Sequence, residues 1–138
     1  FNSQSSTKTP HLTVIITHPP YGSEWAFGGL SMAVAAATNY NIHTNVIFLE
    51  DGVYCVLGSH KISPNTAIFN LQEIIDATLN DSHLHYHVYV PSVLRRTRLS
   101  RLKFPQLSQI QSEDLAEILF PCKDSESDVG ELHRTLLF

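Results

Sequence analysis

One stretch near the start of the chain constrains the fold more than any other. Residues 12–17 are rich in β-branched side chains and are typical of a buried strand. Residues 18–23 contain two prolines and a glycine, and residues 24–40 have the pattern of a helix. A strand, a tight loop and a helix in this order predict the first unit of an α/β sheet. Sites on open parallel sheets lie beyond the carboxyl ends of strands, so this loop is the first candidate site.

The predicted first helix has an expected start and one apolar face. Ser23 is the expected N-cap, and Glu24 is expected in the first turn. Small and apolar residues recur at helical spacing, which predicts a face that packs on the sheet. Gly28 and Gly29 each cost roughly 1 kcal/mol relative to alanine inside a helix. They therefore predict close packing of the backbone or a short irregular start.

The rest of the chain divides by the same reasoning. Continuous or alternating apolar runs predict strands, and apolar residues at helical spacing predict helices. Strands are expected at residues 43–49, 84–90, 107–111 and 132–138, helices at 66–80, 92–98 and 112–120, and a helical turn at 53–57.

Length and composition narrow the class of protein. The 138 residues suit one domain, with residues 1–10 as a polar, disordered tail and residues 11–138 as the folded unit. No run of eighteen apolar residues occurs, so no membrane span is expected. The net charge of -4 disfavours direct binding to nucleic acid. The two cysteines lie far apart and the first ten residues lack signal-peptide features, so a reduced, cytoplasmic protein is expected.

Four short motifs follow one another in a recognisable order. They are Pro20-Tyr21-Gly22 followed by Gly29-Leu30, the run from Phe48 to Tyr54, Leu94-Arg95-Arg96, and the terminal Leu136-Leu137-Phe138. In their order and spacing the chain resembles the DsrE/DsrF-like sulfur-relay proteins, and most closely the DsrF branch, also called TusC. The resemblance covers residues 12–98, is weak over 99–130 and returns at 135–138.

The resemblance implies both a fold and an assembly. The fold would be a three-layer α/β/α arrangement around a mainly parallel sheet of about five strands. The assembly would be a homo-oligomer, or a hetero-oligomer with DsrE- and DsrH-like subunits, with a sulfur-carrier protein as a further candidate partner. No bound cofactor is implied.

The resemblance also implies where a reactive cysteine would stand. Active members carry a persulfide on a cysteine at the end of the third strand, seven residues before the second arginine of the Leu-Arg-Arg-like motif. Counting back from Arg96 gives Tyr89, which cannot carry a persulfide. DsrF-type members often lack this cysteine and serve as partner subunits. A non-catalytic subunit of a sulfur-relay oligomer is therefore the first functional hypothesis.

Cys55 supports a second hypothesis, a sulfurtransferase that carries the persulfide on this thiol. The residue follows Gly52 closely, at the expected carboxyl edge of the sheet, where helix dipoles or His60 could favour the thiolate. The alternative is a small apolar residue packed under the loop. Cys122, beside Lys123 in a polar segment, is expected to be an exposed free thiol with less claim to a function.

The loop at residues 18–23 supports a third hypothesis, a module that binds a small anion or other ligand. Tyr21 and Gly22 lie in the first loop, and Asp51 and Gly52 in the second, so these four are candidate ligand- or partner-binding residues. The alternative for the first loop is a rigid turn. Glu50 and Asp51 could be paired carboxylates for acid–base chemistry or metal binding, but solvated acids of a strand-end turn are expected.

Two further clusters carry charge or metal-ligating groups. His83, His85 and His87 alternate along the expected third strand, which favours a polar strand face over a metal site, so no metal is predicted. The second cluster holds five of the nine basic residues and could receive an acidic partner, an anion or RNA, or form a solvated or intersubunit ion-pair patch. Its members are Arg95, Arg96, Arg98, Arg101 and Lys103, and we take Tyr89, Arg95 and Arg96 as candidate partner-binding residues.

Overall fold

The computed structural model describes residues 10–21, 24–60, 70–120 and 132–138. Residues 1–9 of the expected tail, the expected N-cap Ser23, and the candidate residues Gly22 and Cys122 lie outside the described residues. Pro10, the last residue of the expected tail, is instead the first residue of the first strand.

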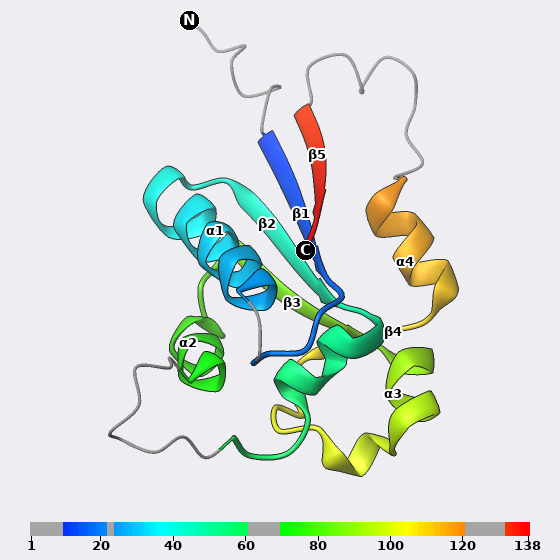
Figure 1. Ribbon diagram of the computed structural model, residues 1–138. Helices are drawn as coiled ribbons and strands as arrows, with labels where there is room; N and C mark the ends of the chain where they lie inside the picture. Colours follow the sequence, from blue (N-terminus) through cyan, green and yellow to red (C-terminus); the bar gives the residue numbers. More distant parts are fainter. Residues whose placement is uncertain (1–9, 22–23, 61–69, 121–131) are drawn as a thin grey trace, which may run out of the picture.

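The described chain forms a five-stranded sheet in the order β4-β3-β2-β1-β5 (Figure 1). The strands are β1 (Pro10–Ile16), β2 (His43–Phe48), β3 (Leu84–Tyr89), β4 (Ser108–Ile110) and β5 (Leu132–Leu137). Every pairing is parallel, so all the strands end at one edge of the sheet. The expected parallel α/β sheet is confirmed.

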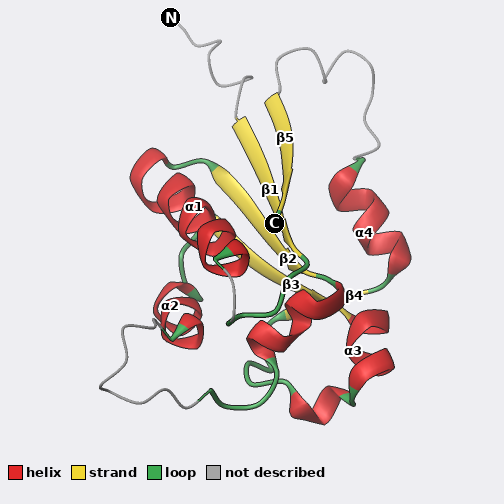
Figure 2. Ribbon diagram, in the orientation of Figure 1, coloured by secondary structure: helices red, strands yellow, loops and turns green. Residues whose placement is uncertain are grey.

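Helices cover both faces of this sheet, as the three-layer prediction requires. The α-helices are α1 (Trp25–Tyr40), α2 (Leu71–Thr78), α3 (Val90–Arg96) and α4 (Ser112–Leu119), and the 3-10 helices are η2 (Glu50–Val56) and η3 (Leu99–Arg101). Figure 2 shows α1 and α2 on one side of the sheet and α4 on the other. The helix η2 directly follows β2, and α3 directly follows β3.

Two helix starts differ from the sequence expectation. Glu24 is the N-cap of α1 rather than a first-turn residue, and its side chain makes no capping hydrogen bond. The second helix is described only from Leu71, where the Asn70 side chain accepts a hydrogen bond from the Gln72 N–H. Such a local side-chain bond competes with helix formation inside a helix but stabilises a helix start. Residues 66–69 of the expected helix lie outside the described residues.

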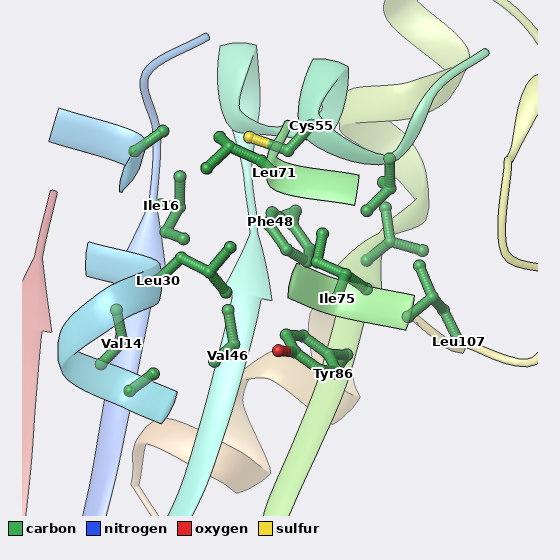
Figure 3. Close-up of a cluster of buried hydrophobic side chains, with 14 of the residues drawn as sticks. Val14, Ile16, Leu30, Val46, Phe48, Cys55, Leu71, Ile75, Tyr86 and Leu107 are labelled. Atoms are coloured by element: carbon green, nitrogen blue, oxygen red, sulfur yellow. The ribbon is translucent and has the colours of Figure 1, made fainter. Parts of the chain in front are cut away.

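The larger core lies between the sheet and the helices α1 and α2. It contains Val14, Val46 and Phe48 of the central strands together with Leu30 and Ile75 of the helices, all at most 1% exposed (Figure 3). A Cβ on Gly29 would lie 2.9 Å from the Phe138 side chain, so the expected close packing occurs at this glycine. A Cβ on Gly28 would meet no atom within 4 Å, so the expectation fails there.

The second face has a smaller core and one buried histidine. Ile15, Ile47 and Ile110 pack against side chains of α4. His87 Nε2 lies 2.8 Å from Asn45 Oδ1, and because that oxygen can only accept, Nε2 is the donor. The other nitrogen, Nδ1, is buried and has no hydrogen-bond partner among the described residues. Burial, and the charge of His85 to a lesser degree, lower the pKa of His87 to about 4.

We therefore expect His87 to make folding sensitive to acid. Its folded pKa lies below the unfolded value near 6.5, so its contribution to stability is complete above pH 6.5 and is lost as the pH falls through 4. A His87→Gln variant keeps a donor for Asn45 and cannot take up a proton. Between pH 7 and pH 5 it should lose roughly 2 kcal/mol less unfolding free energy than the unchanged protein. Urea unfolding of both proteins at the two pH values measures this difference, and equal losses would contradict it.

Candidate functional site

The carboxyl edge of the sheet brings the two strand-end motifs together. The Leu49 N–H donates to the Ile16 carbonyl oxygen at 3.0 Å, which joins the end of β2 to the end of β1. Gly52 then lies so close to β1 that a Cβ on it would fall 1.8 Å from the same Ile16 oxygen. The glycine of the second motif is therefore needed for space, and it lets η2 lie across the end of the sheet.

Glu50 occupies an unusual backbone conformation at the start of η2. Its φ is 52°, in the left-handed region that residues other than glycine seldom adopt. The fully buried Ser92 of α3 holds it there. The Glu50 N–H donates to Ser92 Oγ at 2.9 Å, and the Ser92 hydroxyl donates to Glu50 Oε1 at 3.1 Å. The strained residue is thus held by two hydrogen bonds from a neighbouring helix.

Two ion pairs fasten α3 to η2 at the same place. Arg95 Nη1 lies 3.0 Å from Glu50 Oε1, with both side chains largely exposed. Arg96 donates from Nε and Nη2 to Asp51 Oδ1 at 3.1 and 3.0 Å, and from Nη1 to the Ser92 carbonyl oxygen at 3.1 Å. Glu50 and Asp51 were expected to be solvated, and Arg95 and Arg96 were expected to contact a binding partner. In the structure the two acids form ion pairs with the two arginines.

We expect the two arginines to differ in their effect on stability. The Arg96 side chain is 19% exposed and makes three hydrogen bonds, whereas the Arg95 side chain is 61% exposed and makes one. Arg96→Ala should lower the unfolding free energy by about 1–2 kcal/mol. Arg95→Ala should lower it by less than about 0.5 kcal/mol. Urea denaturation of both variants tests the order, and an equal or larger loss for Arg95→Ala would refute it.

Tyr89 stands where the resemblance places a reactive cysteine. It is the last residue of β3 and the N-cap of α3, so it lies at the carboxyl edge as expected. Its hydroxyl is 2.7 Å from Ser112 Oγ, at the first residue of α4. The side chain therefore links β3 to the helix on the second face.

Cys55 lies on the buried side of η2. Its side chain is 1% exposed and belongs to the larger core, with its sulfur among the apolar side chains shown in Figure 3. Burial raises the pKa of the Cys55 thiol to about 12. Because the thiolate is the nucleophilic form, the thiol is unreactive in this position.

His60 does not serve the Cys55 thiol in the way the sequence suggested. Its Nε2 lies 2.9 Å from the Tyr54 carbonyl oxygen and donates to it, which leaves Nδ1 as an acceptor. The Tyr21 hydroxyl donates to this Nδ1 at 2.9 Å and accepts from the Leu71 N–H at 3.3 Å. Both ring nitrogens are occupied, and burial lowers the pKa of His60, which favours the neutral ring.

Gln72 completes this polar network and was not anticipated from the sequence. It is 4% exposed, its Nε2 donates to the Gly58 carbonyl oxygen at 2.7 Å, and its Oε1 accepts from the His60 N–H at 2.9 Å. A polar residue on the buried face of a predicted amphipathic helix was the available signal. The network joins the first loop, η2 and α2, so the Tyr21 hydroxyl is used inside the fold.

Two features are absent from the described residues. Within those residues, no three or more His, Cys, Asp and Glu side chains are grouped so that they could hold a metal ion. None of the described helices has both the length and the apolar character needed to cross a membrane.

Both the sequence and the fold of the chain are similar to those of known proteins. The model of the DsrE/DsrF-like family matches residues 11–118. The fold is similar to that in the crystal structure of the YchN protein from E. coli, with a TM-score of 0.67 and 17% sequence identity over 94% of this chain and 99% of that one. At this identity the likeness concerns the fold. No curated protein matches the sequence.

Proposed function

The chain belongs to the DsrE/DsrF-like family, and on this premise we propose that it is a non-catalytic, DsrF/TusC-like subunit of a sulfur-relay oligomer. The family implies a role related to sulfur relay. The narrower role proposed here is to complete the oligomer, in the cytoplasm, beside DsrE- and DsrH-like subunits that carry the sulfur.

One observation carries the proposal. The residue at the end of β3 is Tyr89, and its hydroxyl is hydrogen-bonded to another element of the same chain. A persulfide needs a thiol sulfur, and the oxygen of Tyr89 cannot supply one. Its hydrogen bond to Ser112 joins two structural elements, which is a structural use of the position. An active relay subunit would need a nucleophilic sulfur at this edge.

The surroundings of Cys55 also support a non-catalytic subunit. A relay cysteine must meet a sulfur donor and then an acceptor, so it needs access as well as a low pKa. Cys55 is 1% exposed, and burial raises its pKa to about 12. The hypothesis of a sulfurtransferase that uses Cys55 is therefore the weaker one.

The carboxyl edge suits a rigid contact surface better than a reaction site. Gly52 lets η2 lie close to the end of β1. Arg95 and Arg96 of α3 form ion pairs with two acids of η2. These contacts fix the backbone around Tyr89 without leaving the two arginines as unpaired cations. Such a fixed edge is what a subunit needs if it positions a neighbour's reactive loop.

The proposal is tested by assembly and by sulfur transfer measured on the partner. The full chain would be mixed with DsrE- and DsrH-like proteins from the same source and sized by light scattering after gel filtration. We expect a mixed oligomer in which the DsrE-like subunit is the one that gains sulfur from a persulfide donor. A strictly monomeric chain that binds neither protein would refute the proposal.

A further inference from the structure

Histidines occupy the starts of neighbouring strands, at the edge of the sheet opposite the candidate site. The register of β1 and β2 pairs His11 with His43, and His83 directly precedes β3. The ring centroids of His11 and His43 are 5.5 Å apart, and those of His43 and His83 are 5.1 Å apart. On the other side of β1, the register pairs His133 of β5 with His11. We call His11, His43 and His83 the histidine row.

Parallel topology explains why residues so far apart in the sequence meet. All the strands begin at one edge, at the upper end of β1 and β5 in Figure 1, so histidines near the starts of β1, β2 and β3 form a line across the sheet. His11, His43 and His83 are each partly exposed, so solvent and ions can reach the row. No residue of the proposed subunit surface takes part in it.

The spacing of the rings suits chelation by two imidazoles. Two histidines on one tetrahedral ion, with metal–nitrogen distances of about 2.1 Å, place their ring centroids about 5 Å apart. The His43–His83 and His11–His43 spacings of 5.1 and 5.5 Å match this value. The His11 and His43 rings are tilted by only 20°, so they must rotate to face one ion, and the torsion concerned is a soft one.

A neighbouring hydroxyl can support a ligating form of His83. Its Nδ1 lies 3.3 Å from Ser82 Oγ, and its backbone N–H donates to Asp81 Oδ1 at 2.8 Å. When Nδ1 donates to Ser82, Nε2 carries the lone pair that a metal needs. Such a hydrogen bond on the far nitrogen is the usual support of a ligating histidine.

We propose that the histidine row binds a divalent transition-metal ion such as Zn²⁺ or Ni²⁺ through a pair of histidines on adjacent strands. Imidazole nitrogens suit these ions, whereas Mg²⁺ takes oxygen ligands. The described side chains form pairs and not a three-ligand group, so water completes the coordination. This site is separate from the carboxyl edge and does not depend on the proposed relay role.

Calorimetric titration of the full, tag-free chain with ZnCl₂ and with MgCl₂ tests the proposal. Zn²⁺ should bind saturably and Mg²⁺ should not. His43→Gln removes the histidine common to both described pairs and should weaken Zn²⁺ binding roughly tenfold or more. The double variant His11→Gln/His83→Gln leaves no two histidines of the row on adjacent strands and should abolish binding. Because the two variants alter different residues, either one tests the proposal if the other fails to fold.

Two control variants locate the site. His18→Gln alters a histidine stacked on Trp25, beyond the opposite end of β1, and should leave Zn²⁺ binding unchanged. Cys122→Ser removes a thiol outside the described residues and should also leave it unchanged. The proposal is overturned if Zn²⁺ does not bind, if binding survives both row variants, or if either control abolishes it.

Discussion

Replacing Gly52 with alanine should lower the unfolding free energy by about 3 kcal/mol, an effect at the upper end for overpacking. A Cβ at this position would lie 1.8 Å from the Ile16 carbonyl oxygen and 2.6 Å from the Ile16 carbonyl carbon. Both are backbone atoms at the end of a central strand, so neither can rotate away as a flexible side chain could. Relief requires η2 to move off β1, which would also disturb the ion pairs of Glu50 and Asp51.

Gly28 provides the matched control for this substitution. A Cβ there would meet no atom within 4 Å, and the residue lies inside α1. Gly28→Ala should therefore raise stability by up to about 1 kcal/mol. Urea unfolding followed by circular dichroism compares the two variants with the unchanged chain. If Gly52→Ala unfolds at the same urea concentration as the unchanged chain, the close approach of η2 to β1 is wrong.

The second large effect concerns the reactivity of Cys55. In the folded chain its thiol should react with an alkylating reagent more than about a thousandfold more slowly than in the unfolded chain at the same pH near 7. A pKa of about 12, against about 8.5 for a free cysteine, reduces the thiolate fraction by that factor. Burial of the sulfur within the larger core should slow the reaction further.

A Cys122→Ser background isolates Cys55 for this measurement. Mass spectrometry then follows the modified fraction with time, in buffer and in concentrated urea. Alkylation of Cys55 in the folded chain requires local or global opening of the fold. The residual rate should therefore fall further when the fold is stabilised. A rate in buffer equal to that in urea would show that Cys55 is accessible and would restore the sulfurtransferase hypothesis.

Local patterns were enough to predict the elements and an α/β sheet, whereas the resemblance to the DsrE/DsrF-like family implied the three layers and the mainly parallel order of about five strands. The β-branched run of β1 and the continuous apolar run of β2 are typical of strands covered on both faces, and the structure buries them so. The fold class followed from the alternation of these runs with helical spacing. The N-caps Glu24 and Asn70 were not predicted, because capping depends on the φ and ψ angles of single residues.

Contacts between distant residues could not be predicted in this way. The pairs Glu50–Arg95 and Asp51–Arg96 each join residues 45 positions apart, and they form only because η2 and α3 leave adjacent strands at the same edge. The histidine row likewise forms only through the register of β1, β2 and β3. The burial of Cys55 depends on which face of η2 turns inward, and a short 3-10 helix gives no periodic signal for that.

Treatment of the folded chain with a persulfide donor, followed by intact mass measurement and peptide mapping, tests the central claim most directly. If the chain is a non-catalytic subunit, its mass stays unchanged while a DsrE-like partner in the same tube gains one sulfur atom. A gain of one sulfur on Cys55 in the folded state, lost in Cys55→Ser, would contradict this account and make the chain a relay carrier. A sulfur on Cys122 would contradict it as well.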